Sequence, residues 1–241
     1  MADIDSPSEV PGTSLTAGHS SLSTGHSPST THHSPLTTDH RFSIRQTVVV
    51  SIVMVISLSG YMVVLKWRGD DARFITHTDL DEIVPFRPAW VWVYLIPYLV
   101  GPVAIGFLRR ATFNWYISRG IAVVIVTLIV FALVPTQTAK RPSHDLGTSV
   151  TGQLYQNMIA MDEPPANAAP SLHVSLTFLL GVALLMDFPR WWWLSSTGVV
   201  LVWLATLFTR QHHMIDVGTG VLLAAVVVAV WPRRCKIPTR S

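Results

Sequence analysis

Charged side chains are scarce in this chain of 241 residues, where Asp, Glu, Lys and Arg together make up 13%. A soluble globular domain carries roughly 25% charged residues. Hydrophobic residues make up 49% of the chain, and nearly all of them follow Arg41. So few charges on so apolar a chain exclude a soluble protein.

Cysteine is almost absent, and the chain has no dense basic stripe. The single cysteine, Cys235, cannot form an internal disulfide, and no Cys/His spacing resembles a structural zinc site. The net charge is only +3, although the pI is near 9.3. These absences exclude a disulfide scaffold and argue against a nucleic-acid partner.

Apolar side chains are also scarce in residues 1–43, which are rich in Ser, Thr, Pro and His. A segment that cannot bury a core is predicted to be a disordered tail. Metal binding by its histidines is an alternative, but their irregular spacing is not typical of a metal site. No charged start followed by a short apolar run occurs, so we expect no cleavable signal peptide.

Six apolar stretches follow, each near the roughly 20 residues that cross a bilayer as a helix. The fold class that they predict is an all-α, integral-membrane six-helix bundle over residues 44–232. The stretches cover residues 46–65, 89–107, 118–135, 171–187, 192–208 and 213–231.

Basic residues set the expected orientation of the bundle. An even number of spans places both termini on one side, and most of the basic residues fall there, including Arg109, Arg110 and the short basic tail of residues 233–241. The positive-inside rule therefore predicts cytoplasmic termini. We expect a bacterial cell membrane, or an endomembrane if the source is eukaryotic.

Three polar groups lie at the ends of the predicted spans. They are Lys140–Pro142 after the third span, Pro170–His173 at the start of the fourth, and Arg210–Asp216 between the fifth and sixth. Helix parity places all three on one membrane face, opposite the termini. Polar residues are costly in a membrane bundle, so this convergence indicates a functional site.

The first set of residue types suits phosphate. Arg141 and Arg210 carry guanidinium groups that can donate paired hydrogen bonds to phosphate oxygens, and Lys140 adds a point charge. Ser171 lies near the start of a helix, where free amides and the helix dipole favour an anion. Arg141 and Arg210 alone could be ordinary headgroup contacts.

The second set suits proton transfer and nucleophilic attack. His212 and Asp216 are four residues apart, which places both on one face of a helix. Asp216 could then bind one imidazole nitrogen of His212 and leave the other free to attack. His173, from another helix, remains available as a proton donor.

These motifs resemble the type-2 phosphatidic acid phosphatase superfamily. The chain has Arg141–Pro142, Pro170–His173 and His212–Asp216 where that family has its three motifs. Neighbouring segments resemble the branch that contains fungal inositol phosphorylceramide synthase, and the resemblance covers roughly residues 80–231. Those segments are Val84–Leu95, Pro135–Thr136 and Asp162–Ala169.

The resemblance implies a residue-by-residue mechanism without a metal or other cofactor. His212 would form a phosphohistidine, Asp216 would orient it, and His173 would protonate the leaving group. Arg141, Ser171 and Arg210 would hold the phosphate. His213 is a rival nucleophile, but its neighbour four residues on is Val217, so His212 is preferred.

The chain departs from the family pattern at three positions. Val134 stands where the phosphatases have Lys, Leu172 where they have Gly, and Thr206 where they have Arg. These departures favour the synthase-like branch, and we hypothesise that Lys140 and Arg210 supply the missing charge.

Three functions therefore stay open. The main one is cleavage of a membrane lipid phosphoester or diphosphate, with water as acceptor. The alternative is an inositolphosphotransferase-type synthase that uses a lipid alcohol as acceptor. A non-catalytic transporter or scaffold is the third, although transporters place charged residues nearer the midplane.

Overall fold

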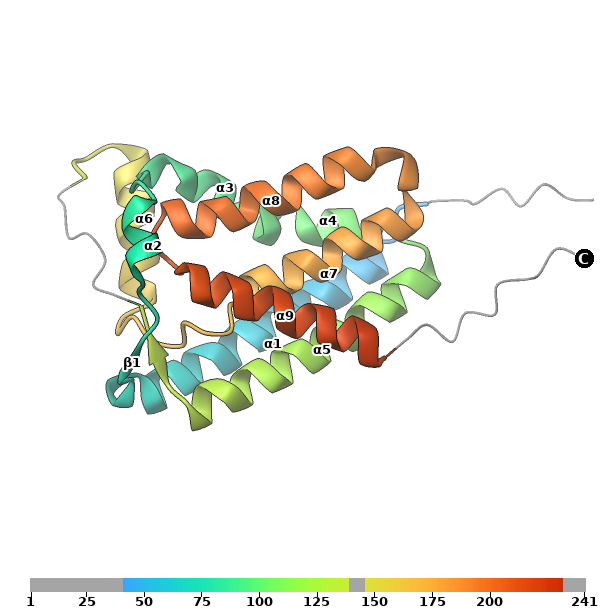
Figure 1. Ribbon diagram of the computed structural model, residues 1–241. Helices are drawn as coiled ribbons and strands as arrows, with labels where there is room; N and C mark the ends of the chain where they lie inside the picture. The colour runs from blue at the N-terminus through green and yellow to red at the C-terminus, as the bar shows by residue number, and fades with distance from the viewer. Residues whose placement is uncertain (1–40, 139–145, 232–241) are drawn as a thin grey trace, which may run out of the picture. The chain divides into compact units, whose positions relative to one another are not determined.

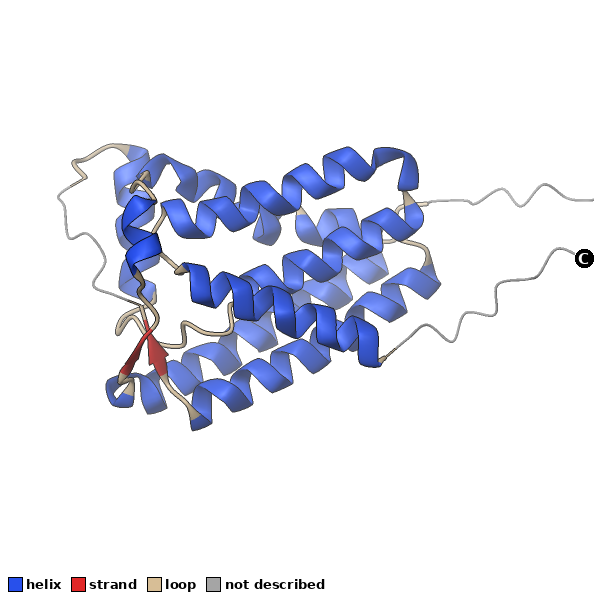
Figure 2. Ribbon diagram, in the orientation of Figure 1, coloured by secondary structure: helices blue, strands red, loops and turns tan. Residues whose placement is uncertain are grey.

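The computed structural model describes residues 41–138 and 146–231, and these are mostly helical (Figures 1 and 2). The predicted disordered tail and the C-terminal basic tail therefore lie almost wholly outside the described residues. The elements are α1 (Ile44–Arg68), η1 (Gly69–Asp71), β1 (Phe74–Ile75), α2 (Asp79–Ile83), η2 (Pro88–Trp90), α3 (Val91–Leu99), α4 (Gly101–Gly106), α5 (Arg110–Leu133), β2 (Thr136–Gln137), α6 (Val150–Met161), α7 (Leu172–Asp187), η3 (Pro189–Trp191), α8 (Trp192–Phe208) and α9 (Met214–Val230).

Within the described residues, four helical segments are long and apolar enough to cross a membrane, and α7 and α9 are shorter apolar helices. Each of the six predicted stretches overlaps one of these segments, although six crossings remain a prediction. The four long segments are Ile44–Asp71, Pro88–Gly106, Arg110–Leu133 and Pro189–Phe208.

Two of the predicted spans differ from the structure. α5 begins at Arg110, well before residue 118. Arg119, which the predicted stretch already contained, lies inside this helix with its guanidinium 4.7 Å from the Trp115 ring and 5.3 Å from the Trp231 ring. The second stretch is divided into α3 and α4 by Pro97 and Pro102, which cannot donate helical hydrogen bonds.

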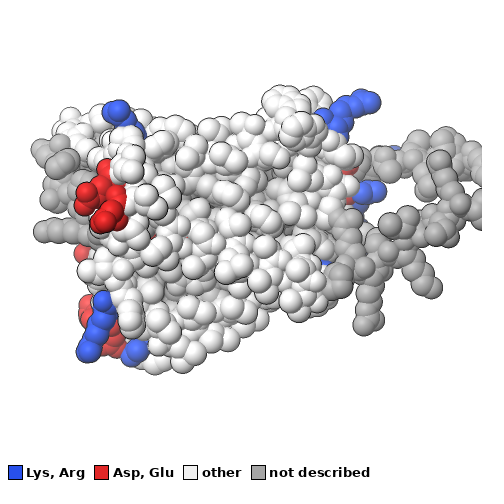
Figure 3. Space-filling model, in the orientation of Figure 1, with Lys and Arg blue, Asp and Glu red and all other residues white. Residues whose placement is uncertain are grey.

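An apolar surface surrounds the helices. Only 11% of the most apolar 18-residue part of α1 is buried inside the protein. Most of the apolar side chains of α1 therefore face outwards, as in a helix that contacts lipid. On the face in Figure 3, charged side chains lie at the two ends of the helices with an uncharged band between them. The structure thus supports an integral membrane protein.

α7 is the central helix, and it packs against α5, α8 and α9. The buried core continues along α5 and α7 through Phe113, Tyr116, Val123, Leu179 and Ala183. This packing holds the first turn of α7, which carries His173, beside the start of α9.

Small elements cover the end of the bundle where α7 and α9 begin. β1 pairs with β2 in parallel, and α2 and α6 lie at the same end (Figure 1). The prediction of an all-α chain missed this strand pair, because two-residue strands have no detectable alternation. It also missed α6, whose many polar residues look like a loop.

Candidate active site

The first turn of α7 holds His173 rigidly. Ser171 caps the helix through a hydrogen bond from the Val174 N–H at 3.3 Å. The His173 ring stacks on Tyr94 at a centroid distance of 4.4 Å, and its Nδ1 lies 3.2 Å from the Tyr98 hydroxyl. Among the described residues Nε2 has no hydrogen-bond partner, so this nitrogen remains available to a ligand.

The start of α9 holds a buried carboxylate. His213 is the N-cap, and its backbone N–H donates to Asp216 Oδ2 at 2.8 Å. The Thr76 hydroxyl, next to β1, donates to the same oxygen at 3.2 Å. Asp216 is completely buried, and its Oδ1 has no partner within residues 41–138 and 146–231.

His212 lies close to this carboxylate, but the helical reason given for the spacing was wrong. His212 is in the turn after α8, before the N-cap of α9, so the two residues do not share a helix face. Its Nδ1 still lies 3.6 Å from Asp216 Oδ2 because the turn folds back over the helix start.

The neighbouring His213 occupies a different environment. Its Nδ1 lies 3.2 Å from the Thr76 hydroxyl and 4.0 Å from Asp216 Oδ2, and its side chain is 3% exposed. Burial lowers the pKa of the His213 imidazole, although the Asp216 and Asp81 carboxylates act in the opposite direction. His212, in contrast, lines the cavity described below.

α7 and α9 approach very closely at the site. The Ser171 N–H donates to the Asp216 carbonyl at 3.0 Å, and the Ser175 hydroxyl donates to the Gly220 carbonyl at 2.8 Å. A Cβ atom at Gly220 would lie 2.7 Å from the Ser171 carbonyl oxygen. This contact brings the two histidine-bearing segments to one cavity.

Of the four predicted phosphate ligands, two lie within the described residues. Lys140 and Arg141 lie outside the described residues, and Ser171 is fully buried as the cap of α7. Arg210 adopts a left-handed backbone conformation with φ 55°. Its guanidinium donates to the Asp81 and Val84 carbonyls, each at 2.7 Å, so it joins the His212 turn to the α2 segment.

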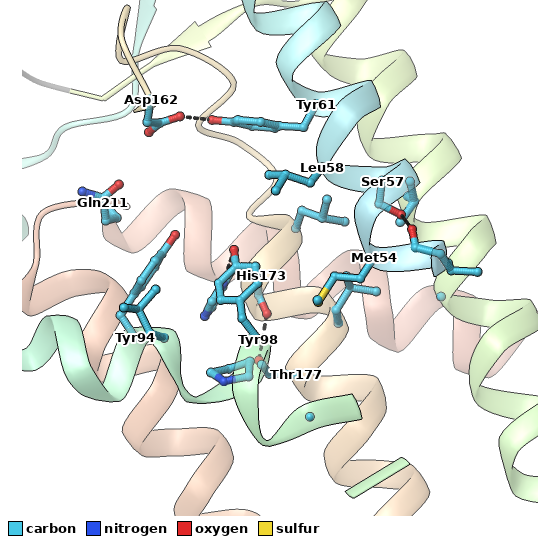
Figure 4. A pocket seen from close by; sticks show the side chains of 18 of the residues that line it. Met54, Ser57, Leu58, Tyr61, Tyr94, Tyr98, Asp162, His173, Thr177 and Gln211 are labelled. Atoms are coloured by element: carbon cyan, nitrogen blue, oxygen red, sulfur yellow. Dashed lines mark hydrogen bonds between the residues drawn. The ribbon is translucent and has the colours of Figure 1, made fainter. Parts of the chain in front are cut away.

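A cavity of about 430 Å³ begins at the two histidines and continues between the helices. This volume lies within the ~300–1,000 Å³ of typical ligand pockets. In Figure 4, His173 and Tyr98 lie between Gln211 and Tyr94 on one side and Met54 and Leu58 of α1 on the other. The cavity therefore has a polar end at the histidines and apolar walls beyond them.

Several polar residues of this cavity were given no role in the expectations drawn from the sequence. The Tyr61 hydroxyl donates to Asp162 Oδ1, as Figure 4 shows, and Asn167 and Gln211 line the same space. Asp162 and Asn167 lie in the segment that precedes the Pro-Ser-Leu-His motif, but nothing in the sequence alone joins them to Tyr61.

Within the described ranges, no three His, Cys, Asp or Glu side chains cluster as ligands for a metal ion.

Comparison with protein families finds one match over this region. The family model described as the PAP2 superfamily matches residues 84–230, which include α3 to α9 and both histidines. Comparisons with curated proteins and with solved structures found no match. On the strength of the family match over more than half of its length, the chain belongs to the PAP2 superfamily.

Proposed function

We propose that the protein is an integral-membrane lipid phosphatase or phosphotransferase in which His212 is the nucleophile. The observation that carries the proposal is that His212 and His173 line one cavity, with the Asp216 carboxylate 3.6 Å behind His212. Membership of the PAP2 superfamily and the long apolar helices support a lipid phosphatase kind of activity.

The first half of the reaction transfers the phosphoryl group to the enzyme. Because His212 Nδ1 is directed towards Asp216, Nε2 is the nitrogen that attacks phosphorus. The N–P bond forms as the P–O bond to the lipid alcohol breaks. Protonated His173 gives its Nε2 proton to the departing oxygen, and the products are a phosphohistidine and a free lipid alcohol.

The second half returns the enzyme to its starting state. Water or an alcohol attacks phosphorus, loses its proton to His173 Nε2, and the N–P bond breaks. Water yields phosphate, whereas an alcohol yields a new phosphoester. Asp216 keeps the His212 imidazole oriented in both halves and stabilises its charged form.

Lys140, Arg141, Ser171 and Arg210 are the proposed phosphate ligands. In the structure Arg210 uses two of its donors on backbone carbonyls, so any phosphate contact would fall to its remaining N–H groups. No step of this proposal requires a metal.

The active site is proposed to face the periplasm, the cell exterior or an organelle lumen. Arg109 is the N-cap of α5 and Arg110 is its first residue, at the end of the bundle away from the histidines. The positive-inside rule puts this basic end of the bundle on the cytoplasmic side of the membrane. The histidines are therefore proposed to lie on the opposite side.

Transfer to an alcohol is the second candidate, as in an inositolphosphotransferase. Leu172, Val134 and Thr206 replace the residues of the plain phosphatases, and this pattern favours it. The transporter or scaffold alternative predicts that His212 is dispensable for every lipid reaction.

Phosphate release by the detergent-purified protein tests the proposal. Wild type, His212→Ala and His213→Asn would be compared with chelator present, on phosphatidate, a polyprenyl diphosphate and a sphingolipid phosphate. We expect His212→Ala to lose on the order of 10³-fold or more. His213→Asn should keep most of the activity, because asparagine is also a good N-cap.

Equal activity of wild type and His212→Ala would refute the mechanism. If no substrate releases phosphate, phosphatidylinositol would be added with ceramide or diacylglycerol. Formation of a new phosphoester would then identify a transferase, and its absence would favour the transporter or scaffold.

A further inference from the structure

Two buried amide side chains at the polar end of the cavity have polar atoms that no described residue hydrogen-bonds. Asn167 is 1% exposed and Gln211 is 4% exposed, and both line the cavity with His173 and His212. Within the described part of the chain, Asn167 Oδ1, Asn167 Nδ2 and Gln211 Nε2 have no partner. A buried polar group without a partner is costly, so such groups in a cavity indicate a ligand that supplies the missing bonds.

Both amides are held in place by their backbone. The segment around Asn167 is fixed to β2 by the Ala169 N–H, which donates to Thr136 Oγ1 at 2.9 Å, and by the Thr138 N–H, which donates to the Pro165 carbonyl at 2.9 Å. Asn167 itself has φ 59°, a left-handed conformation that asparagine tolerates better than most residues. Gln211 directly precedes His212, and its N–H donates to the Thr206 carbonyl at 3.0 Å.

The chemistry of these amides differs from that of a phosphate site. A phosphate dianion offers acceptors only, so it would leave the Asn167 Oδ1 acceptor without a partner. A hydroxyl both donates and accepts hydrogen bonds. It can therefore donate to Asn167 Oδ1 and at the same time accept from one of the two amide NH₂ groups. An amide N–H of the ligand could also donate to Oδ1. A polyprenyl phosphate has neither group beside its phosphoester.

We infer that Asn167 and Gln211 bind a hydroxyl or amide N–H that the substrate's alcohol portion carries close to the phosphoester. The substrate class is then a glycerol- or sphingoid-based lipid phosphate with such a donor, whose hydrocarbon chain occupies the apolar part of the cavity. This inference rests on the proposed function, because it places the scissile bond between His212 and His173.

A matched pair of substrates tests it. Lysophosphatidate has a free hydroxyl beside its phosphoester, and its 2-deoxy analogue lacks only that group. We expect the wild-type kcat/KM to be at least about tenfold higher for lysophosphatidate, since a site built for a hydroxyl rejects the analogue without it. Asn167→Gly is compatible with the left-handed backbone conformation at this position and removes the side-chain amide. It should lower kcat/KM for lysophosphatidate about tenfold and leave the value for the deoxy analogue unchanged.

Two more variants sharpen the result. Gln211→Leu should also reduce the preference for the hydroxylated substrate. Asn157→Ala removes an exposed amide from the α6 wall of the cavity and should keep the wild-type preference.

The outcomes separate the inference from the proposed function. An equal loss on both substrates in Asn167→Gly, or no preference in wild type, would overturn the inference while the phosphatase activity stands. His212-dependent turnover of a polyprenyl diphosphate with none of either lysolipid would also overturn the inference and leave the proposed function standing. If no lipid and no alcohol acceptor gives His212-dependent activity, the proposed function fails, and the inference fails with it.

Discussion

Asp81, in the first turn of α2, supports the turn that carries His212 from two directions. Its Oδ1 accepts the Met214 N–H at 2.8 Å at the start of α9, and its carbonyl accepts Arg210. Its Oδ2 accepts the Thr78 N–H at 2.8 Å and the Thr78 hydroxyl at 2.7 Å. One buried carboxylate thus joins α2 to both sides of His212, although it is outside the motifs that the sequence analysis used.

A pH-dependent loss of stability should follow from Asp81. Burial alone would raise the pKa of its carboxyl, but the hydrogen bonds from Thr78 and Met214 outweigh burial and leave the pKa below the ordinary 3.8. A carboxyl group whose pKa is lower in the folded state stabilises that state at any pH above its unfolded-state pKa. This stabilisation is lost as the pH falls through the folded-state pKa. Asp81→Asn should therefore lower the melting temperature at neutral pH, and the difference from wild type should shrink below about pH 4.

Thermal unfolding of both proteins, from neutral pH down to about pH 3, measures this difference. A constant difference across that range would show that the Asp81 charge does not stabilise the turn.

Among the helices, the contact of α7 with α9 decides where His173 and His212 meet. Gly220 faces the Ser171 backbone, and a Cβ there would also lie 3.2 Å from Val174 Cβ. Here a glycine is required by close approach, since any side chain would push the two helix starts apart.

Gly220→Ala should therefore weaken both the fold and the site. We expect a loss of about 1–3 kcal/mol in the free energy of unfolding, typical of overpacking. Activity should fall because His173 moves away from His212. Unfolding in denaturant and phosphate release from the same preparation measure the two effects.

Gly218→Ala is the matched control in the same helix. Nothing lies within 4 Å of a Cβ at Gly218, so this variant should be neutral or slightly stabilising. If the two variants behaved alike, the effect would belong to helix propensity and not to the α7–α9 contact.

At the scale of the whole molecule, the end of the bundle opposite the histidines is held by a different set of contacts. Asp187 at the end of α7 accepts the Arg109 N–H at 2.6 Å and the Thr112 hydroxyl at 2.6 Å, and it forms an ion pair with the Arg109 side chain at 2.7 Å. Arg119 is enclosed between Trp115 and Trp231 at the same end. The basic residues counted for topology are therefore partly structural.

Labelling with a membrane-impermeant thiol reagent tests the orientation. Cys235 is the chain's only cysteine and is predicted to be cytoplasmic, so it should react only after the membrane is permeabilised. Glu82→Cys in a Cys235→Ser background places the thiol on α2 at the histidine end, where the Glu82 side chain is 74% exposed, and it should react in intact cells. The opposite pattern would reverse the proposed topology.

The sequence predicted the helices where apolar runs are long, and the membrane face on which it gathers the polar motifs stays a prediction. It placed His173, His212 and Asp216 together correctly as neighbours of one region, because helix parity depends only on the order of spans. It could not predict the Asp81–Arg210 link or Thr76 beside Asp216. Those contacts join short polar segments with no periodicity, and only tertiary packing determines them.

The match to the PAP2 superfamily begins at residue 84, yet several contributors to the site precede it. Thr76 donates to Asp216, and Tyr61 on α1 forms a wall of the cavity with Asp162. A recombinant fragment limited to the matched region would keep both histidines but open the cavity on one side and deprive Asp216 of a hydrogen bond. A fragment that keeps the whole cavity wall and the Thr76 bond to Asp216 therefore has to extend back into α1.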